Sequence, residues 1–315
     1  MATKKTPTRS GAKPAKSAGK KKSSSAQQGI PIGMQAMRDL QRLLSKQHFA
    51  SEQELEAFLN RMMAEGIPEF EPTTEEEQAE ALVDEGFNSE ALRAVDLARQ
   101  ALELDPQCIP AFDLLGRCEA LEPIRAAYFK RGVDLGEERF GDVYRKKNEG
   151  HFWGLTETRP YMRCLAGYAD SLFFMGDLLS AMDVWQDMLL LSSGDNLGVR
   201  YHLLLCMAAL GEAEEFAAID AIYADDALAA AYYNRALLAF TTQGPSPAAD
   251  KALRAAMQRN PNVPALLVQA DEPDAWHDAI TLGSQEEALT YCERAWMIWQ
   301  GRPGAVEWLQ RVAKP

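Results

Sequence analysis

The sequence contains few of the residues that carry chemistry in enzymes and metal sites. Its 315 residues include four histidines and five cysteines, with no Cys-x-x-Cys pair. Glycine-rich phosphate loops, His-Glu-x-x-His and Asp-rich calcium loops are also absent. We therefore predict no enzyme activity, no cofactor and no metal, and we interpret the scattered cysteines as reduced core thiols. They are Cys108, Cys118, Cys164, Cys206 and Cys292.

Long apolar runs are missing as well. No stretch approaches the ~18 consecutive apolar residues of a membrane-spanning helix, and the amino terminus lacks the apolar centre of a secretory signal. These absences predict a cytoplasmic protein that does not enter a membrane.

Acidic residues are lacking from the first 29 positions, "MATKKTPTRSGAKPAKSAGKKKSSSAQQG". This segment contains seven lysines and Arg9, so the net charge of −13 leaves −21 on the rest of the chain. With no aromatic or branched apolar residue, residues 1–29 cannot bury enough surface to fold, and we predict a disordered basic tail. Such a tail can bind RNA, DNA or ribosomes, or it can act as a solubilising leader that contacts its own acidic body.

Two helices are predicted over residues 30–72. "MQAMRDLQRLLSKQHF" has apolar residues at helical spacing, and "SEQELEAFLNRMMAEG" begins with a capping box of Ser51 and Glu54 and ends at Gly66. We interpret them as a helical hairpin. Pro68 and Pro72 then break the pattern, which sets a domain boundary at about residue 72.

From residue 73 to residue 315 the chain repeats a helical pattern. Gly176, Gly211 and Gly244 fall at predicted turns between paired helices, at intervals of 35 and 33 residues. These intervals are close to the ~34-residue tetratricopeptide period. The helix after Gly176 carries a packing face of Ala181, Trp185 and Met188. We predict an all-α, tetratricopeptide-like α-solenoid of antiparallel helix pairs.

The last two helices are predicted to close this array. "SQEEALTYCERAWMIW" starts with a capping pair of Ser284 and Glu287, and "PGAVEWLQRV" follows it. We expect Trp296, Trp299 and Trp308 to cover the end of the array.

The carboxy-terminal third resembles the suppressor-of-tumorigenicity family. That family shares an Asn-Pro-x-Val-Pro segment, a Gly-Ser/Asp-x-Glu-Ala helix and a Trp followed by Gly-Ala. The matching positions here are Asn260, Pro261, Val263, Pro264, Gly283, Glu287, Ala288, Trp299, Gly304 and Ala305. The resemblance is strongest over about residues 160–310, and "ETRPYMR" is similar to a stretch in bacterial tetratricopeptide proteins. It implies a helical-repeat fold and attaches no reaction.

The stretch "HFWGLTETRPYMRCLAGYADSL", residues 151–172, gathers polar and aromatic residues. We interpret it as the start of a helix, with Pro160 in the first turn and Thr156 or Thr158 capping the free amides. The alternative is that Trp153, Tyr161 and Arg163 line a groove.

Aligning the three glycines predicts which residues line a concave surface. The candidate binding residues are Arg163, Asp170, Tyr201, His202, Asn234 and Arg235. Arginine and asparagine can hydrogen-bond a peptide, and tyrosine adds apolar area. The alternative is that these are ordinary solvated or inter-helix polar residues. His202 and Cys206 lie one helical turn apart, but no further metal ligands follow at a suitable spacing.

The function predicted from these patterns is a non-catalytic adaptor that binds a peptide or protein segment in the concave groove. The alternative is an RNA- or ribosome-associated factor that attaches through its lysine-rich tail.

Overall fold

A computed structural model describes residues 34–68, 70–271, 273 and 280–314. These residues form helices, turns and connections with no strand among them, so the predicted all-α class is confirmed over this part of the chain. The predicted basic tail, residues 1–29, lies outside the described residues. The chain divides into two compact units, Met1–Glu71 and Pro72–Pro315.

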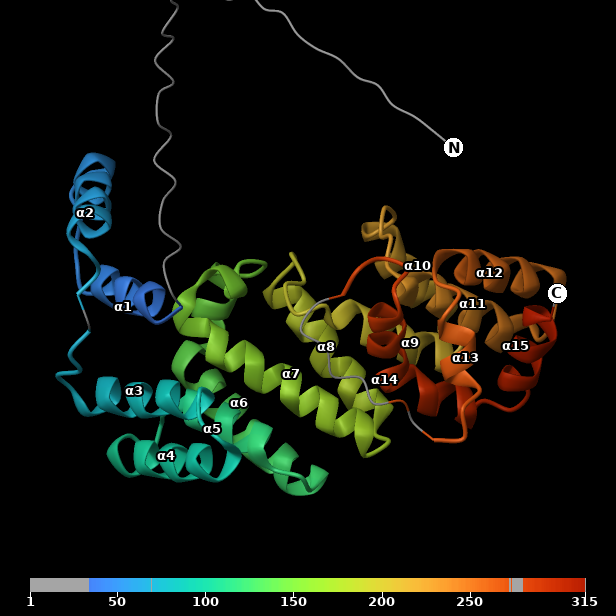
Figure 1. Cartoon of the computed structure of the whole chain (residues 1–315), viewed down its shortest axis with the longest axis horizontal. Helices are drawn as coiled ribbons and strands as arrows, with labels where there is room; N and C mark the ends of the chain where they lie inside the picture. Colours follow the sequence, from blue (N-terminus) through green and yellow to red (C-terminus); the bar gives the residue numbers. More distant parts are fainter. Residues whose placement is uncertain (1–33, 69, 272, 274–279, 315) are drawn as a thin grey trace, which may run out of the picture. The chain divides into compact units, whose positions relative to one another are not determined.

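The first unit contains α1 (Met34–Ser45) and α2 (Glu52–Glu65) (Figure 1). Ser51 accepts a hydrogen bond from the Glu54 amide at 3.3 Å, which confirms the predicted cap of α2. The Glu54 carboxylate reaches one residue further back than expected and accepts from the Ala50 amide at 2.8 Å.

Five helix pairs make up most of the second unit. In chain order the pairs are α3 (Glu75–Phe87) with α4 (Ala91–Leu104), α5 (Ile109–Cys118) with α6 (Glu122–Lys147), α7 (Arg159–Phe174) with α8 (Leu178–Leu191), α9 (Val199–Leu210) with α10 (Ala213–Ile222), and α11 (Ala229–Gln243) with α12 (Pro247–Arg259). Two 3-10 turns, η1 (Phe152–Gly154) and η2 (Thr156–Thr158), precede α7. After the pairs come α13 (Val263–Leu267), α14 (Gln285–Gly301) and α15 (Ala305–Ala313).

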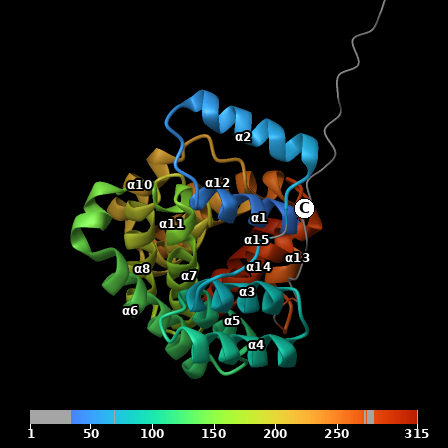
Figure 2. The same cartoon turned by 90° about the vertical axis from the view of Figure 1, so that its left-hand side faces the viewer.

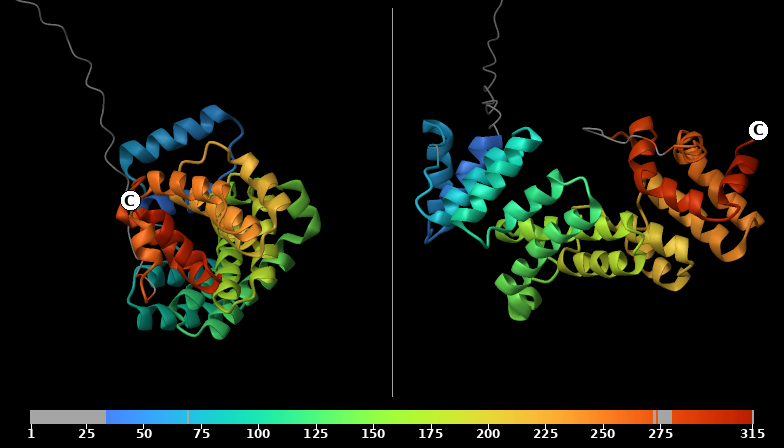
Figure 3. Two further views of the ribbon diagram at one scale, coloured as in Figure 1. Left: turned by 90° about the vertical axis from the view of Figure 1, so that its right-hand side faces the viewer. Right: turned by 90° about the horizontal axis from the view of Figure 1, so that it is seen from below.

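The pairs pack mainly against their chain neighbours. From α3 to α12 each helix contacts the next, and among the first members of the pairs α3 packs on α5, α5 on α7, and α9 on α11. Seen end-on, α3 and α7 lie nearer the middle of the view than their partners α4 and α8 (Figure 2). Figure 3 shows the same succession from the other end and from below. We call α3, α5, α7, α9 and α11 the inner helices.

In three of these pairs a glycine with a positive φ lies between the two helices. Gly176, Gly211 and Gly244 have φ of 85°, 82° and 67°, a region that a residue with a Cβ atom adopts only with strain. Each follows an inner helix directly or after one residue, as predicted. The predicted packing face of α8, Ala181, Trp185 and Met188, is buried.

The start of α7 is built differently from the prediction. Pro160 lies in the first turn, but Thr158 does not cap the helix. The Thr158 hydroxyl instead donates to the Leu155 carbonyl at 2.9 Å and to that of Phe152, which ties the two 3-10 turns together. The capping prediction for Thr158 is therefore wrong, because the turns before the helix leave this hydroxyl buried and facing carbonyl groups.

Candidate functional site

The inner helices of the carboxy-terminal pairs are covered by α14. This helix packs on α9 and α11 and reaches α7 through one arginine (Figure 1). We predicted that α14 would close the end of the array. α15 packs on α12, and its Trp308 stacks on Phe240 of α11 with ring centres 4.6 Å apart. α14 also contacts α15, but its packing on α9 and α11 places α14 against the inner helices.

A buried polar network fixes the start of α14. Glu287 accepts hydrogen bonds from the amide of Ala229 at 2.9 Å, the amide of Gly283 at 2.6 Å and the side-chain amide of Asn260 at 3.0 Å. Asn260 and Glu287 are buried, so each of these bonds replaces a hydrogen bond to water that the group lost on burial. The network joins α11, α12 and α14, and it gives a structural role to two residues of the family resemblance.

The middle of α14 is held by Arg294. Its guanidinium donates to Asp170 of α7 at 2.7 Å and lies 5.7 Å from the centre of the Phe174 ring. Burial lowers the pKa of Arg294, but the carboxylates of Asp170 and Glu293 outweigh burial and raise it. The candidate residue Asp170 therefore binds a helix of its own chain.

Three other candidate residues, His202, Tyr201 and Arg235, also have partners inside the chain. His202 packs against Trp185, with ring centres 5.6 Å apart, and burial together with Arg294 lowers its pKa well below the usual range. The Tyr201 hydroxyl accepts from Arg200, and Arg235 binds Asp220 of α10 at 2.8 Å.

Asn234 does not lie on an open surface. Its side chain is fully buried and donates to the Tyr201 carbonyl at 2.9 Å, so it joins α9 to α11. The prediction that Asn234 lines an open groove is therefore wrong, because its helix, α11, packs on α9.

The sixth candidate, Arg163, belongs to a cluster on α5 and α7 that the sequence analysis missed. Asp113 is buried, and its two carboxylate oxygens accept from Nε of Arg117 at 2.7 Å and from Nε of Arg163 at 2.6 Å. The ring of Phe87, at the end of α3, has its centre 5.9 Å from Cζ of Arg163. An aspartate inside the apolar run "IPAFDLLGRC", four residues before an arginine, is the signal that could have identified it.

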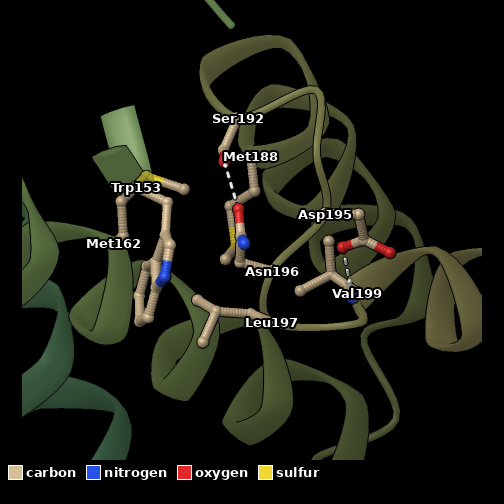
Figure 4. Close-up of a pocket in the computed structure, with 8 residues that line it drawn as sticks. All are labelled: Trp153, Met162, Met188, Ser192, Asp195, Asn196, Leu197 and Val199. Carbon is tan, nitrogen blue, oxygen red and sulfur yellow. Dashed lines mark hydrogen bonds between the residues drawn. The ribbon is translucent and has the colours of Figure 1, made fainter. Parts of the chain in front are cut away.

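One cavity of the second unit lies beside the start of α7. A cavity between η1, α7 and the start of α9 has a volume of about 10 Å³, enough for about one water molecule (Figure 4). Trp153 and Asp195 both line it, and the Asp195 carboxylate accepts from the Val199 amide at 2.8 Å. Tyr161, the other aromatic residue that we considered for a groove, is fully buried. This cavity is too small to hold a cofactor or substrate.

Three buried thiols have raised pKa values. Burial raises the pKa of Cys108, Cys206 and Cys292 to about 12, so these thiols are protonated at neutral pH. Over the residues that the structure describes, no three His, Cys, Asp or Glu side chains gather as metal ligands do. Within the same residues, no helix combines the length and apolar character needed to cross a bilayer.

The open part of the inner helices is thus the side of α3, α5 and α7 that carries Phe87, Arg117 and Arg163. Neither a scan against models of protein families nor a search of curated proteins finds a match to this chain.

Proposed function

We propose that this chain is a non-catalytic, cytoplasmic interaction protein that holds a segment of a partner protein against the inner helices α3, α5 and α7. The proposal includes a tetratricopeptide-like solenoid. It is supported by the nearest-neighbour packing of the pairs and by the glycine turns at 35- and 33-residue intervals. The suppressor-of-tumorigenicity resemblance remains part of it, and the buried Asn260–Glu287 bond is consistent with a shared fold.

One observation carries this proposal: the inner helices already hold a helical segment, α14. Its contacts with α7 and α11 combine a charged pair, Arg294 with Asp170, and a backbone amide bound by Glu287. A surface that accepts one helix through such contacts is suited to accept another where no helix of its own covers it.

That uncovered surface lies on α3 and α5. Within the described part of the second unit, α5 packs mainly on α3, α4, α6 and α7, and α3 packs mainly on α4 and α5. Single side-chain contacts also join α3 to α6 and to α7. Phe87 and Arg117 remain exposed there. A partner segment on this side would bury an aromatic ring and meet charged groups, the combination found at binding hot spots.

Site-specific photocrosslinking tests the proposal. A benzophenone amino acid replaces Phe87, which keeps an aromatic ring at this position, or, as a control, Leu179 of α8, an apolar residue that is 63% exposed. In extracts of the source cells we expect a discrete crosslinked partner from position 87 and none from position 179. An excess of unlabelled chain should suppress this product. Equal labelling from both positions, or none from position 87, would contradict the proposal.

A second candidate function rests on the tail. Seven lysines and Arg9 without an acid are suited to attach the chain to RNA or ribosomes, with the helical unit contacting protein.

A further inference from the structure

We propose that Arg117 and Arg163, positioned by the buried carboxylate of Asp113, form a binding site for an oxyanion on the partner segment. The oxyanion is a carboxylate or a phosphate that lies next to an apolar side chain. This inference rests on the proposed function and names the chemistry that its surface recognises.

The two arginines use the same atom to hold Asp113. Both donate through Nε, at 2.7 Å from Arg117 and 2.6 Å from Arg163. No described residue accepts a hydrogen bond from the terminal nitrogens of either guanidinium. The Arg117 side chain is 52% exposed and that of Arg163 is 28% exposed, while Asp113 is 0% exposed. The unused nitrogens are therefore accessible, whereas the group that orients them is not.

This arrangement differs from the other arginine clusters of the second unit. Arg200 and Arg294 each bind two carboxylates, so their charge is compensated within the chain. Asp250 also faces two arginines, but Arg311 binds it through its terminal nitrogens. At Asp113 one carboxylate faces two guanidinium groups, which leaves one net positive charge.

The physical chemistry favours an oxyanion at this place. A buried carboxylate is costly unless its hydrogen bonds are satisfied, and two guanidinium groups satisfy both oxygens of Asp113. The same bonds hold the guanidinium planes in place, so less side-chain entropy is lost when a ligand binds. Planar guanidinium groups pair with carboxylate and phosphate oxygens through charge-assisted bonds.

Phe87 adds selectivity for the neighbouring residue. Its ring lies 5.9 Å from Cζ of Arg163 and is 36% exposed. An apolar or aromatic side chain beside the oxyanion would pack on this ring. The preferred ligand is therefore an acidic or phosphorylated residue next to an aromatic one, within a protein segment.

Three fluorescein-labelled peptides provide the probes. They are acetyl-Glu-Glu-Phe-Glu-Glu, the same peptide with glutamine in place of glutamate, and acetyl-Gln-Gln-phosphoserine-Phe-Gln. Fluorescence anisotropy with the full chain should show binding of at least one anionic peptide about tenfold or more tighter than the glutamine peptide, the range expected from charge-assisted bonds. The tighter of the two anionic peptides identifies carboxylate or phosphate as the ligand.

Variants then locate the site. Arg117→Gln and Arg163→Gln should each weaken the anionic peptide about tenfold, while Arg254→Gln, whose side chain is 60% exposed on α12, should leave it unchanged. Each arginine also satisfies the buried Asp113, so circular dichroism checks that both variants fold. In wild-type protein, the Nε–H resonances of Arg117 and Arg163 should shift on titration with the anionic peptide.

Unchanged affinity in the Arg117 variant, or equal affinity for the glutamine peptide, would overturn this inference. The crosslinking result separates that failure from failure of the proposed function. A partner that still crosslinks at position 87 in an Arg163→Gln background would show that the surface binds a segment without this oxyanion site.

Discussion

Two glycines of α6 show how a single missing methyl group sets the distance between helices. A Cβ atom on Gly132 would overlap Sγ of Cys164, and one on Gly136 would overlap the ring of Tyr161. Both neighbours are fully buried residues of α7. The four-residue spacing places both glycines on one face of α6, so the backbone of this helix approaches α7 closely.

Substitution of one of these glycines should therefore destabilise the fold. Gly136→Ala is expected to lower the free energy of unfolding by about 1–3 kcal/mol, because the extra methyl group overpacks a buried ring. Gly301→Ala is the matched control, since no atom lies within 4 Å of its added Cβ and its φ is not positive. Urea unfolding measures both, and a loss of equal size in the two variants would contradict the packing explanation.

For single residues, the sequence predicted which side chains are buried better than it predicted which residue each side chain contacts. The packing stripe of α7, including Leu165, Ala169 and Leu172, follows from helical periodicity and is buried in the structure. The partner of Asp170 could not be predicted, because Arg294 lies 124 positions further along the chain. Periodicity gives the face on which a residue lies, whereas the identity of the facing residue depends on tertiary packing.

One aspartate of α12 binds two residues of the last helix, α15. Asp250 of α12 accepts from the indole nitrogen of Trp308 at 2.7 Å and from Arg311 at 2.9 Å. The hydrogen bond from Trp308, followed by the bond and charge of Arg311, lowers the pKa of Asp250 despite the opposing effect of burial. The ionised carboxylate is thus the form that holds α15.

A pH series should reveal this attachment. A carboxyl group with a lowered pKa in the folded state stabilises the fold above its ordinary value of 3.8, and this contribution is lost as the pH falls. Asp250→Asn is therefore expected to unfold more easily than wild type at pH 7. The gap between the two proteins should narrow as the pH falls below 3.8. Thermal unfolding monitored by circular dichroism measures it, and a gap that widens in acid would refute the assignment.

Helix ends were more predictable than helix docking. The bond from the Glu54 amide to Ser51 and the bond from the Glu287 amide to Ser284 both form as expected. The packing of α14 on α9 and α11 could not be predicted. A cap specifies where a helix begins, but it carries no information about which surface the helix covers. Apolar residues lie on several sides of α14, among them Ala288, Met297 and Ile298, and are compatible with more than one packing.

On the scale of the whole molecule, charge is strongly divided along the sequence. The first 29 residues carry +8 and the remainder −21, so the two parts attract opposite partners. This division is the basis for the proposed contact with RNA, and a salt titration can separate it from a purely solubilising role.

Deletion of residues 1–29 tests that contact. If the tail attaches the chain to RNA, the full chain should bind poly-uridine with an affinity that falls steeply between about 50 and 200 mM salt, and the deletion should remove this binding. A chain of full length with glutamine in place of the seven lysines and Arg9 controls for tail length. Binding that survives the deletion, or that fails to respond to salt, would exclude the tail as the attachment.

The all-α class could be predicted because composition and period act over the whole chain, and errors at single residues average out. The candidate surface could not be placed in the same way. Its position depends on which inner helices α14 leaves uncovered. This is decided by where α14, a helix near the carboxyl end of the sequence, packs on the preceding helices.

The position of α14 also affects competition. A covalently linked helix is present at its own binding surface at an effective concentration on the order of millimolar. A free protein with a similar helix, at micromolar abundance, would lose about a thousandfold in occupancy against this built-in competitor. Selection for new partners would therefore act on the two arginines of α5 and α7 rather than on α9 and α11, where the chain supplies its own ligand.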